Sequence, residues 1–251
     1  MINFYVMTLF PEMVENGLNV SILKRAKEAG RLGFEAINIR DYTLDKHMKV
    51  DDYPYSGGAG MLMNPDPIVR CHNAVMDKIP EERKGKVRTI YLSPAGRMFN
   101  QDMARDFAKN EDLIFICGHY EGIDQRAIDM VVTDEVSIGD YVLTGGELAA
   151  MVMIDSISRM VSGVLHNDVS AETETFSGNL LEYPQYTHPE TYEGRRVPPV
   201  LLSGNHKLID EWKRTQSLVR TRERRPDLFE KVELSKQDKK LLKKYDEETG
   251  V

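Results

Sequence analysis

Two glycine-rich segments constrain the fold of this chain more than any other feature: GHYEG, Gly118–Gly122, and IGDYVLTGGE, Ile138–Glu147. Each follows a short apolar run of the kind that forms a buried strand. Glycine at the end of a strand lets backbone N–H and C=O groups approach a ligand, because no Cβ stands in the way. Ligands of open α/β sheets lie at the carboxyl ends of the strands. The two segments therefore predict a ligand site at that edge of a sheet, although an ordinary tight turn is the alternative interpretation of either one alone.

The amino-terminal part of the chain alternates short apolar runs with amphipathic stretches. Such alternation predicts an α/β fold in which a parallel sheet carries helices on both faces. From the spacing of the apolar residues, strands are expected at 2–9, 34–39, 87–92 and 113–117, and helices at 11–29, 65–79, 101–108 and 148–161.

The pattern changes beyond a first domain expected over residues 1–161. Residues 162–178 are rich in small and polar side chains, which predicts a flexible linker. A small helical domain is expected over 179–251, with basic helices at 208–222 and 236–244. Between Arg195 and Lys244 there are 15 Lys and Arg against 7 Asp and Glu, although the whole chain carries a formal charge of −7. A basic segment of this kind can hold a phosphate backbone, or it can be a solvated helix face.

Several classes of protein are disfavoured by what the sequence lacks. It has no apolar run of about 18 residues and no signal peptide, so we expect a soluble, cytoplasmic protein without a membrane partner. Cys71 and Cys117 are too few for a disulfide scaffold and are expected to be buried thiols. No histidine has metal-ligand spacing, and His119 is expected to be a packed or hydrogen-bonded loop residue. The glycine motifs of dinucleotide and nucleoside triphosphate sites are absent.

Six motifs, in order over nearly the whole chain, resemble those of the bacterial tRNA (guanine-N1)-methyltransferases. This resemblance implies transfer of a methyl group from S-adenosylmethionine to N1 of the guanosine immediately 3′ of the anticodon in tRNA. It also implies a homodimer of the SPOUT class with a shared active site and a trefoil knot at the cofactor site, which general topology rules would not predict. The motifs are YSGGAGMLM (55–63), YLSPAGR (91–97), GHYEGIDQR (118–126), SIGDYVLTGGELAAM (137–151), PPVLLSGNH (198–206) and RTRERRPDL (220–228).

The resemblance implies a cofactor site built from three of these motifs. Backbone groups would read the adenine edge, and apolar Ile138 and Leu143 would enclose the ring. The carboxylate of Glu121 would offset the positive charge of the sulfonium. Magnesium dependence is implied as well, but no protein-only site is evident, so the ion would act through the RNA or the substrate. The implied cofactor-binding residues are Tyr91, Leu92, Ser93, Pro94, Gly118, Tyr120, Glu121, Ser137, Ile138, Gly139, Asp140, Tyr141, Val142, Leu143, Gly145 and Gly146.

Guanine N1 carries a proton, so methylation there needs a base to remove the proton and a cation or donor to stabilise charge on O6. The resemblance places an essential arginine at Arg159, in the helix after the second glycine segment. It places the base in SAETETF, Ser170–Phe176, where Glu174 stands in place of the family's aspartate and Thr175 replaces a serine. Glutamate can act as the base, but its extra methylene moves the oxygens. Together with Glu121, Arg159 and Glu174 are the implied catalytic residues.

The basic carboxy-terminal domain is implied to grip the tRNA through phosphate contacts, which give affinity but little base selectivity. Trp212 is expected to pack rather than to bind. The substitutions in the linker leave two alternatives open: a related RNA methyltransferase with a shifted target, and a catalytically silent RNA-binding homologue. The expected RNA-binding residues are Ser170, Lys213, Arg214, Arg220, Arg222, Arg224 and Arg225.

Overall fold

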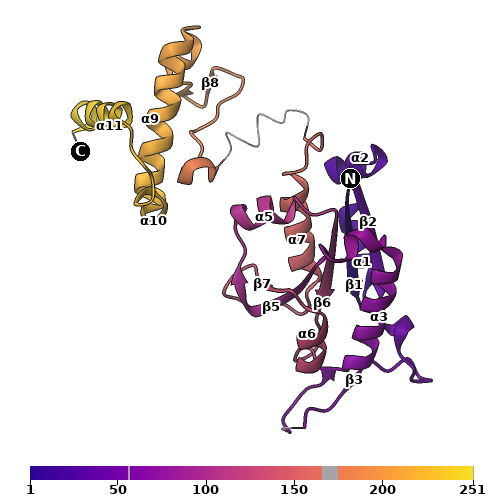
Figure 1. The fold of residues 1–251 in the computed structure, drawn as a ribbon. Coiled ribbons are helices and arrows are strands. Elements are labelled where there is room, and N and C mark those ends of the chain that lie inside the picture. The colour runs from indigo at the N-terminus through magenta and orange to yellow at the C-terminus, as the bar shows by residue number, and fades with distance from the viewer. Residues whose placement is uncertain (56, 166–174, 251) are drawn as a thin grey trace. The chain divides into compact units, whose positions relative to one another are not determined.

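The chain forms two compact units, Met1–Asp168 and Val169–Val251, in a computed structural model that describes residues 1–55, 57–165 and 175–250 (Figure 1). The linker expected at 162–178 spans the division between them. Two expected site residues, Ser170 and Glu174, lie outside the described residues. Each unit is described by itself below.

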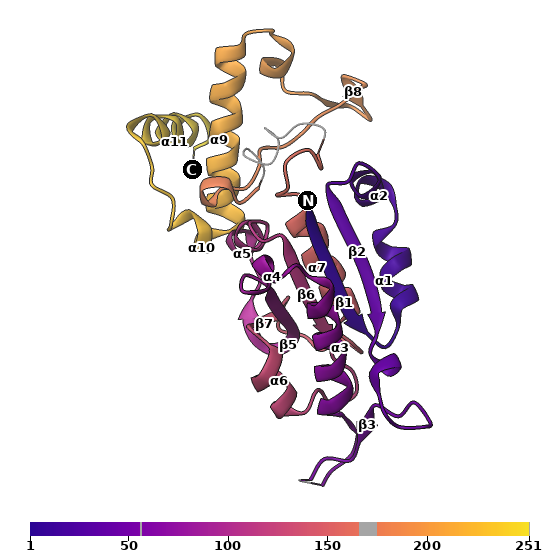
Figure 2. The ribbon, with the colours of Figure 1, turned by 45° about the vertical axis from the view of Figure 1, so that its right-hand side comes forward.

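The first unit is built on a five-stranded sheet in the order β2-β1-β6-β5-β7, with every neighbouring pair parallel (Figure 2). All six residues of the middle strand, β6, are buried. A parallel sheet covered on both faces has this continuous apolar character, and the prediction of such a sheet is confirmed. The strands are β1 (Ile2–Thr8), β2 (Leu32–Asn38), β5 (Arg88–Met98), β6 (Asp112–Cys117) and β7 (Asp134–Ser137).

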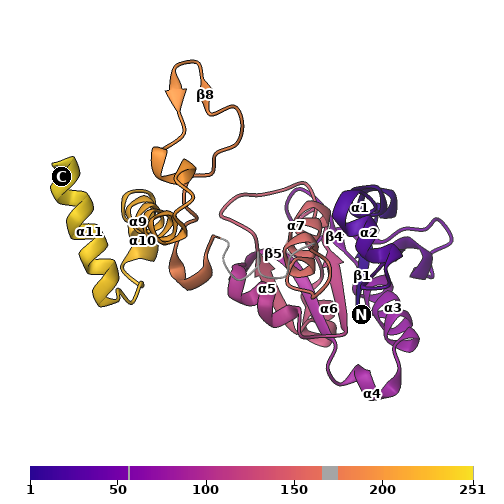
Figure 3. The ribbon, with the colours of Figure 1, turned by 90° about the horizontal axis from the view of Figure 1, so that it is seen from above.

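Helices cover both faces of this sheet (Figures 1 and 3). Successive residues of β6 alternate between two cores: Leu113 and Phe115 pack with α1, α2, α5 and α7, whereas Ile114 and Ile116 pack with α3 and α6. This alternation follows from the two-residue period of a strand. The helices are α1 (Pro11–Leu18), α2 (Ser21–Glu28), α3 (Pro65–Lys78), α5 (Gln101–Phe107), α6 (Gln125–Val131) and α7 (Glu147–Ser158), with short α4 (Glu81–Lys84), η1 (Ile39–Tyr42) and the pair β3 (Asp51–Asp52) and β4 (Leu62–Met63) between them.

The single helix predicted at 11–29 is wrong, because α1 ends at Leu18 and α2 begins at Ser21. Asn19 closes the first helix and Val20 is extended, with φ −132° and ψ 158°. Asparagine favours helix ends over helix interiors, since its side chain competes with the backbone for hydrogen bonds. The break buries both Leu18 and Leu23 in the same core.

Strand β5 is longer than the predicted 87–92, because it pairs with β7 in two separate registers. Leu92 and Arg97 both lie opposite Val136, so residues 93–96 between them arch out of the sheet. A Cβ on Gly96 would stand 2.3 Å from the backbone N of Val136, so only glycine allows this approach. The strand order and register do not test the expected trefoil knot, which stays a prediction.

The second unit is helical, as predicted, and its two long helices extend the stretches expected at 208–222 and 236–244. Its small core contains Leu180, Leu218, Val219 and Leu242. The elements are η2 (Ser177–Asn179), the hairpin of β8 (Thr191–Tyr192) and β9 (Arg195–Arg196), η3 (Pro199–Leu202), α9 (His206–Arg224), α10 (Pro226–Phe229) and α11 (Lys236–Thr249).

An ion pair between a buried aspartate and an exposed arginine joins the two long helices of this unit. Asp238 is 4% exposed and accepts hydrogen bonds from Nε and Nη2 of Arg214 at 2.7 and 3.0 Å. It also completes a capping box with Ser235 at the start of α11. Arg214 is the main cause that lowers the pKa of the Asp238 carboxyl to about 2.

We expect this pair to make the second unit sensitive to acid. The folded pKa lies below that of an unfolded aspartate, so the stabilisation is complete above about pH 4 and is lost as the pH falls toward 2. Because the side chain of Arg214 is 43% exposed and solvent screens the pair, the shift corresponds to at most about 2 kcal/mol. Urea unfolding followed by the fluorescence of Trp212, the only tryptophan, should show that Asp238→Asn lowers stability at pH 6 and removes most of that loss between pH 4 and 2. An equal acid sensitivity in the variant would contradict this assignment.

Candidate active site

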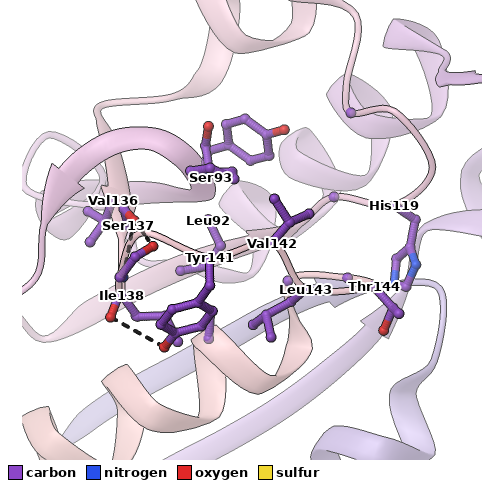
Figure 4. A pocket seen from close by; sticks show the side chains of 18 of the residues that line it. Leu92, Ser93, His119, Val136, Ser137, Ile138, Tyr141, Val142, Leu143 and Thr144 are labelled. Atoms are coloured by element: carbon purple, nitrogen blue, oxygen red, sulfur yellow. Dashed lines mark hydrogen bonds between the residues drawn. The ribbon is translucent and has the colours of Figure 1, made fainter.

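A cavity of about 290 Å³ lies at the carboxyl ends of β5, β6 and β7 (Figure 4). Its three walls are the arch after Tyr91, the loop 118–122 and the loop 136–146. Every residue predicted to bind cofactor lines it except Asp140, which is exposed. The sequence did not single out His119, Gly122, Val136, Thr144 and Ala149 as lining residues.

Two of the predicted glycines bring the loops against each other. The N–H of Gly146 donates to the C=O of Gly118 at 3.1 Å. A Cβ on Gly146 would stand 2.7 Å from Cα of Cys117, and one on Gly145 would stand 2.3 Å from Cε1 of His119. These glycines therefore allow the two loops to pack closely against each other, in addition to any role in ligand binding.

The loop that follows β7 is held by its own hydrogen bonds (Figure 4). The hydroxyl of buried Ser137 donates to the C=O of Gly139 at 3.1 Å, and the hydroxyl of Tyr141 donates to the C=O of Ile138 at 3.4 Å. Val142 and Leu143 point in opposite directions in Figure 4, and Val142 is 84% exposed while Leu143 packs against the core. The loop thus presents one apolar side chain to the interior and one outward.

Glu121 provides an exposed carboxylate at the rim of the cavity. Its N–H donates to the C=O of Met61 at 3.0 Å, and a Cβ on Gly60 would stand 2.3 Å from its Cγ. The glycine loop around residues 57–60 therefore packs directly against this side chain. The neighbouring Tyr120 accepts a hydrogen bond on its hydroxyl from Arg40 at 3.4 Å.

Beneath the glycine loops, a buried carboxylate ties three segments together. Glu147 is 2% exposed and accepts a hydrogen bond from the hydroxyl of Thr8 at 2.5 Å. Nε2 of His119 lies 2.8 Å from both of its carboxylate oxygens, and an ionised carboxylate can only accept, so Nε2 donates. The ring of Phe10 packs edge-on against the imidazole at 4.9 Å. The prediction that His119 is a packed, hydrogen-bonded loop residue is confirmed.

Neither cysteine is a nucleophile. Both are buried, as predicted. Burial raises the pKa of the Cys71 thiol to about 12 and also raises that of Cys117. A thiol that stays protonated at neutral pH is inert.

Arg159 lies at the opposite end of α7 from the cavity. Helix α7 begins at Glu147, beside the cavity, and Arg159 is the residue that closes it. A rise of 1.5 Å per residue puts these positions roughly 18 Å apart along the helix axis, which is beyond the reach of an arginine side chain. The chain therefore does not bring Arg159 to its own cavity.

The six basic residues of the second unit that are expected to bind phosphate fall into two groups. Arg214, Arg222 and Arg225 are each held by two hydrogen bonds to Asp238, Asp246 and Asp227, in that order. Lys213 lies over the ring of Tyr183, and Arg220 and Arg224 line a second cavity. Trp212 contacts the rings of Tyr183 and Tyr186, so its predicted packing role is confirmed.

The described residues contain neither a metal-binding cluster nor a membrane-spanning helix. Among residues 1–55, 57–165 and 175–250, no three His, Cys, Asp or Glu side chains gather closely enough to hold a metal ion. Within the same ranges, every helix is too short or too polar to cross a membrane.

The fold and the site together define a class of α/β protein in which a glycine-walled cavity lies at the edge of a parallel sheet, and a second, helical unit carries the basic segment 195–244. The model of the family "tRNA (Guanine-1)-methyltransferase TrmD" matches residues 2–231. Curated proteins named tRNA (guanine-N(1)-)-methyltransferase are similar over most of both chains. One from Lachnoclostridium phytofermentans is 53% identical, covering 96% of this chain and 95% of its own. One from Caldicellulosiruptor saccharolyticus is 55% identical, covering 96% of each chain. One from Lachnospira eligens is 57% identical, covering 91% of this chain and 95% of its own.

The chain therefore belongs to the tRNA (guanine-1)-methyltransferase family, a family of enzymes, and the resemblance of its motifs is confirmed. The two alternatives, a methyltransferase with a shifted target and a silent RNA-binding homologue, are not favoured by these comparisons.

Proposed function

We propose that this chain transfers a methyl group from S-adenosylmethionine to N1 of the guanosine immediately 3′ of the anticodon in tRNA. The observation that carries this proposal is that the motifs at 91–94, 118–122 and 137–146, distant in sequence, line one cavity in a chain that matches the family over residues 2–231. We assign the reaction to a methyltransferase domain over 1–161, joined by a linker over 162–178 to a tRNA-binding domain over 179–251. Because the proposed substrate is tRNA, we also propose that the protein acts in the cytoplasm.

The residues of the cavity suit S-adenosylmethionine. Backbone groups are accessible beside Gly118, and Ile138 and Leu143 supply apolar surface for a purine ring. Glu121 offers a carboxylate at the rim, where it would favour a cation. The bound cofactor supplies a methyl group on a positively charged sulfur.

The chain's own residues would handle the proton of guanine. Glu174 would accept the proton from N1, and the N1 lone pair would then be free to form the new bond to the methyl carbon, with the sulfur leaving as the neutral thioether of S-adenosylhomocysteine. The guanidinium of Arg159 would donate to O6, where negative charge develops as N1 loses its proton. Mg²⁺ would act through the RNA, because the described residues contain no group of three His, Cys, Asp or Glu side chains that could hold the ion.

The position of Arg159 supports a homodimer with a shared site. Arg159 lies roughly 18 Å along α7 from the cavity of its own protomer. It can therefore take part in methyl transfer only at the cavity of a second protomer. The chain also exposes an apolar surface where α1 meets α7: Phe10, Met13, Leu148 and Val152 are each between 41% and 52% exposed. Exposed apolar patches of this kind mark protein interfaces. In the proposed dimer, the loops of one protomer meet Arg159 and the linker of its partner.

A mixed dimer tests the sharing of sites. One protomer carries Arg159→Ala and the other carries Gly146→Ala. At an S-adenosylmethionine concentration well below the dissociation constant of the Gly146→Ala variant, each homodimer is expected to have little activity. In a shared arrangement one site of each heterodimer is intact, so mixing equal amounts should recover about a quarter of the wild-type rate. Activity no higher than that of the two parents would contradict a shared site.

The reaction itself is tested by the identity of the product. Labelled S-adenosylmethionine and a tRNA transcript are incubated with the protein, and the RNA is digested to nucleosides. We expect the label in N1-methylguanosine. Label in any other nucleoside would sink the proposal.

A further inference from the structure

An extended segment of the second unit, Leu180–Tyr186, lies along helix α9. The N–H of Leu181 donates to the hydroxyl of Thr221 at 2.9 Å, and the hydroxyl of Ser217 donates back to the C=O of Leu181. Tyr183 and Tyr186 contact Trp212 further along the same helix. Ring contacts and hydrogen bonds therefore hold the segment against α9 at both ends.

A cavity opens between this segment and α9. Arg220 and Arg224 line it from the helix, and Thr175, Glu182 and Gln185 line it from the opposite side. The two arginines are four residues apart, so their side chains lie one turn from each other on one face. Arg220 is half-buried and Arg224 is exposed.

Among the described residues, these two arginines differ from the others of α9 in having no carboxylate partner. Arg214 donates two hydrogen bonds to Asp238, and Arg222 donates two to Asp246, so both arginines connect α9 to α11. Within the part of the chain that the structure describes, neither Arg220 nor Arg224 forms an ion pair. Each guanidinium thus keeps a planar fork of donors that suits a phosphate.

The other lining groups set the charge and the polarity of the cavity. The carboxylate of Glu182 accepts a hydrogen bond from the amide of Gln185 at 2.6 Å. Two guanidinium groups and one carboxylate leave a net charge of +1, which matches the single negative charge of a phosphodiester. The hydroxyl of Thr175 accepts from the N–H of Glu182 at 3.3 Å, so its own proton is available to an acceptor.

We infer that this cavity is a phosphate subsite, in which Arg220 and Arg224 bind one phosphodiester of the tRNA strand and Glu182 limits the attraction. The identity of the RNA rests on the proposed function. Thr175 directly follows Glu174, the proposed base, so the phosphate held here belongs to the nucleotides around the target guanosine. Of the six basic residues expected to bind phosphate, Arg214 and Arg222 also hold α9 to α11 through Asp238 and Asp246.

The test is the salt dependence of tRNA binding by the full chain. Arg220→Gln and Arg224→Gln should each weaken binding about tenfold and lower the slope of log K against log salt by about 0.7 to 0.9. Glu182→Gln should tighten binding, a gain that a folding defect does not produce. Lys231→Gln removes one exposed positive charge of the same unit away from the cavity and should leave the slope close to that of wild type.

Two results would overturn the subsite: wild-type slopes in both arginine variants, or weaker binding in Glu182→Gln. The fluorescence of Trp212 and the thermal unfolding of each variant confirm that the unit is folded. Methyl transfer by the wild-type chain is measured on the same preparation. Its absence would count against the proposed reaction, whereas the salt slopes report on the subsite alone.

Discussion

Glu174→Gln is expected to lower kcat by about 10³-fold, because glutamine keeps the shape of glutamate but cannot accept the proton of guanine N1. Binding of S-adenosylmethionine should be unchanged, since the cavity that we assign to the cofactor is formed by residues 91–149. Single-turnover methyl transfer at saturating tRNA measures this effect directly. Glu172→Gln, two residues earlier in the same segment, is the matched control and should retain nearly full activity.

The rate of the Glu174→Asp variant shows whether the active site is adapted to glutamate at this position. We expect Glu174→Asp to be slower than wild type, because losing a methylene withdraws the oxygens by about 1 Å, and such a misplacement can cost on the order of 10²-fold. A faster aspartate variant would show that glutamate is poorly placed. A Glu174→Gln enzyme within about tenfold of wild type would remove Glu174 from the role of base.

Gly146→Ala is expected to lower both the stability of the fold around the cavity and the affinity of the cavity for its ligand. The new Cβ would stand 2.7 Å from Cα of Cys117 and 3.2 Å from the N of Gly118, so backbone must move to admit it. We expect the free energy of unfolding to fall by about 2 kcal/mol. Affinity for S-adenosylmethionine should fall at least about tenfold, because the two loops can no longer approach each other. Urea unfolding and titration calorimetry measure the two effects.

Gly85→Ala is the control for this substitution. Gly85 has φ −68° and ψ −6°, close to the φ −80° and ψ −10° of Gly146, so alanine is equally compatible with both backbones. A Cβ on Gly85 would meet nothing within 4 Å. The control should therefore be neutral or slightly stabilising. If both variants bind cofactor equally well, the close approach of the loops is not what shapes the cavity.

Most of the first unit could be predicted from local sequence pattern. The apolar runs at β1 and β6 and the amphipathic stretch at α3 carry strong periodic signals, and the structure has these elements within about two residues of the expected bounds. The arch within β5 could not be predicted in this way. It depends on Val136 pairing with both Leu92 and Arg97, which is a tertiary contact with no local signature.

The candidate site shows the same division between local and distant signals. Glycine motifs predicted where the cavity lies, because glycine allows a loop backbone to come closer to a ligand or to another loop than a Cβ would permit. The contact of Thr8 with Glu147 spans 139 positions, and that of His119 with Glu147 spans 28, so sequence reasoning left the network unnoticed. Likewise, the sequence could not separate Arg214, which Asp238 holds from 24 positions away, from Arg220, which lines a cavity.

The central claim is tested most directly by methyl transfer to two tRNA transcripts that differ only in the base immediately 3′ of the anticodon. With labelled S-adenosylmethionine, we predict incorporation into the transcript that has guanosine there, and loss of incorporation when that guanosine is replaced. Equal incorporation into both transcripts would contradict the proposed target. No incorporation into either, with cofactor binding still measurable, would contradict the proposed reaction.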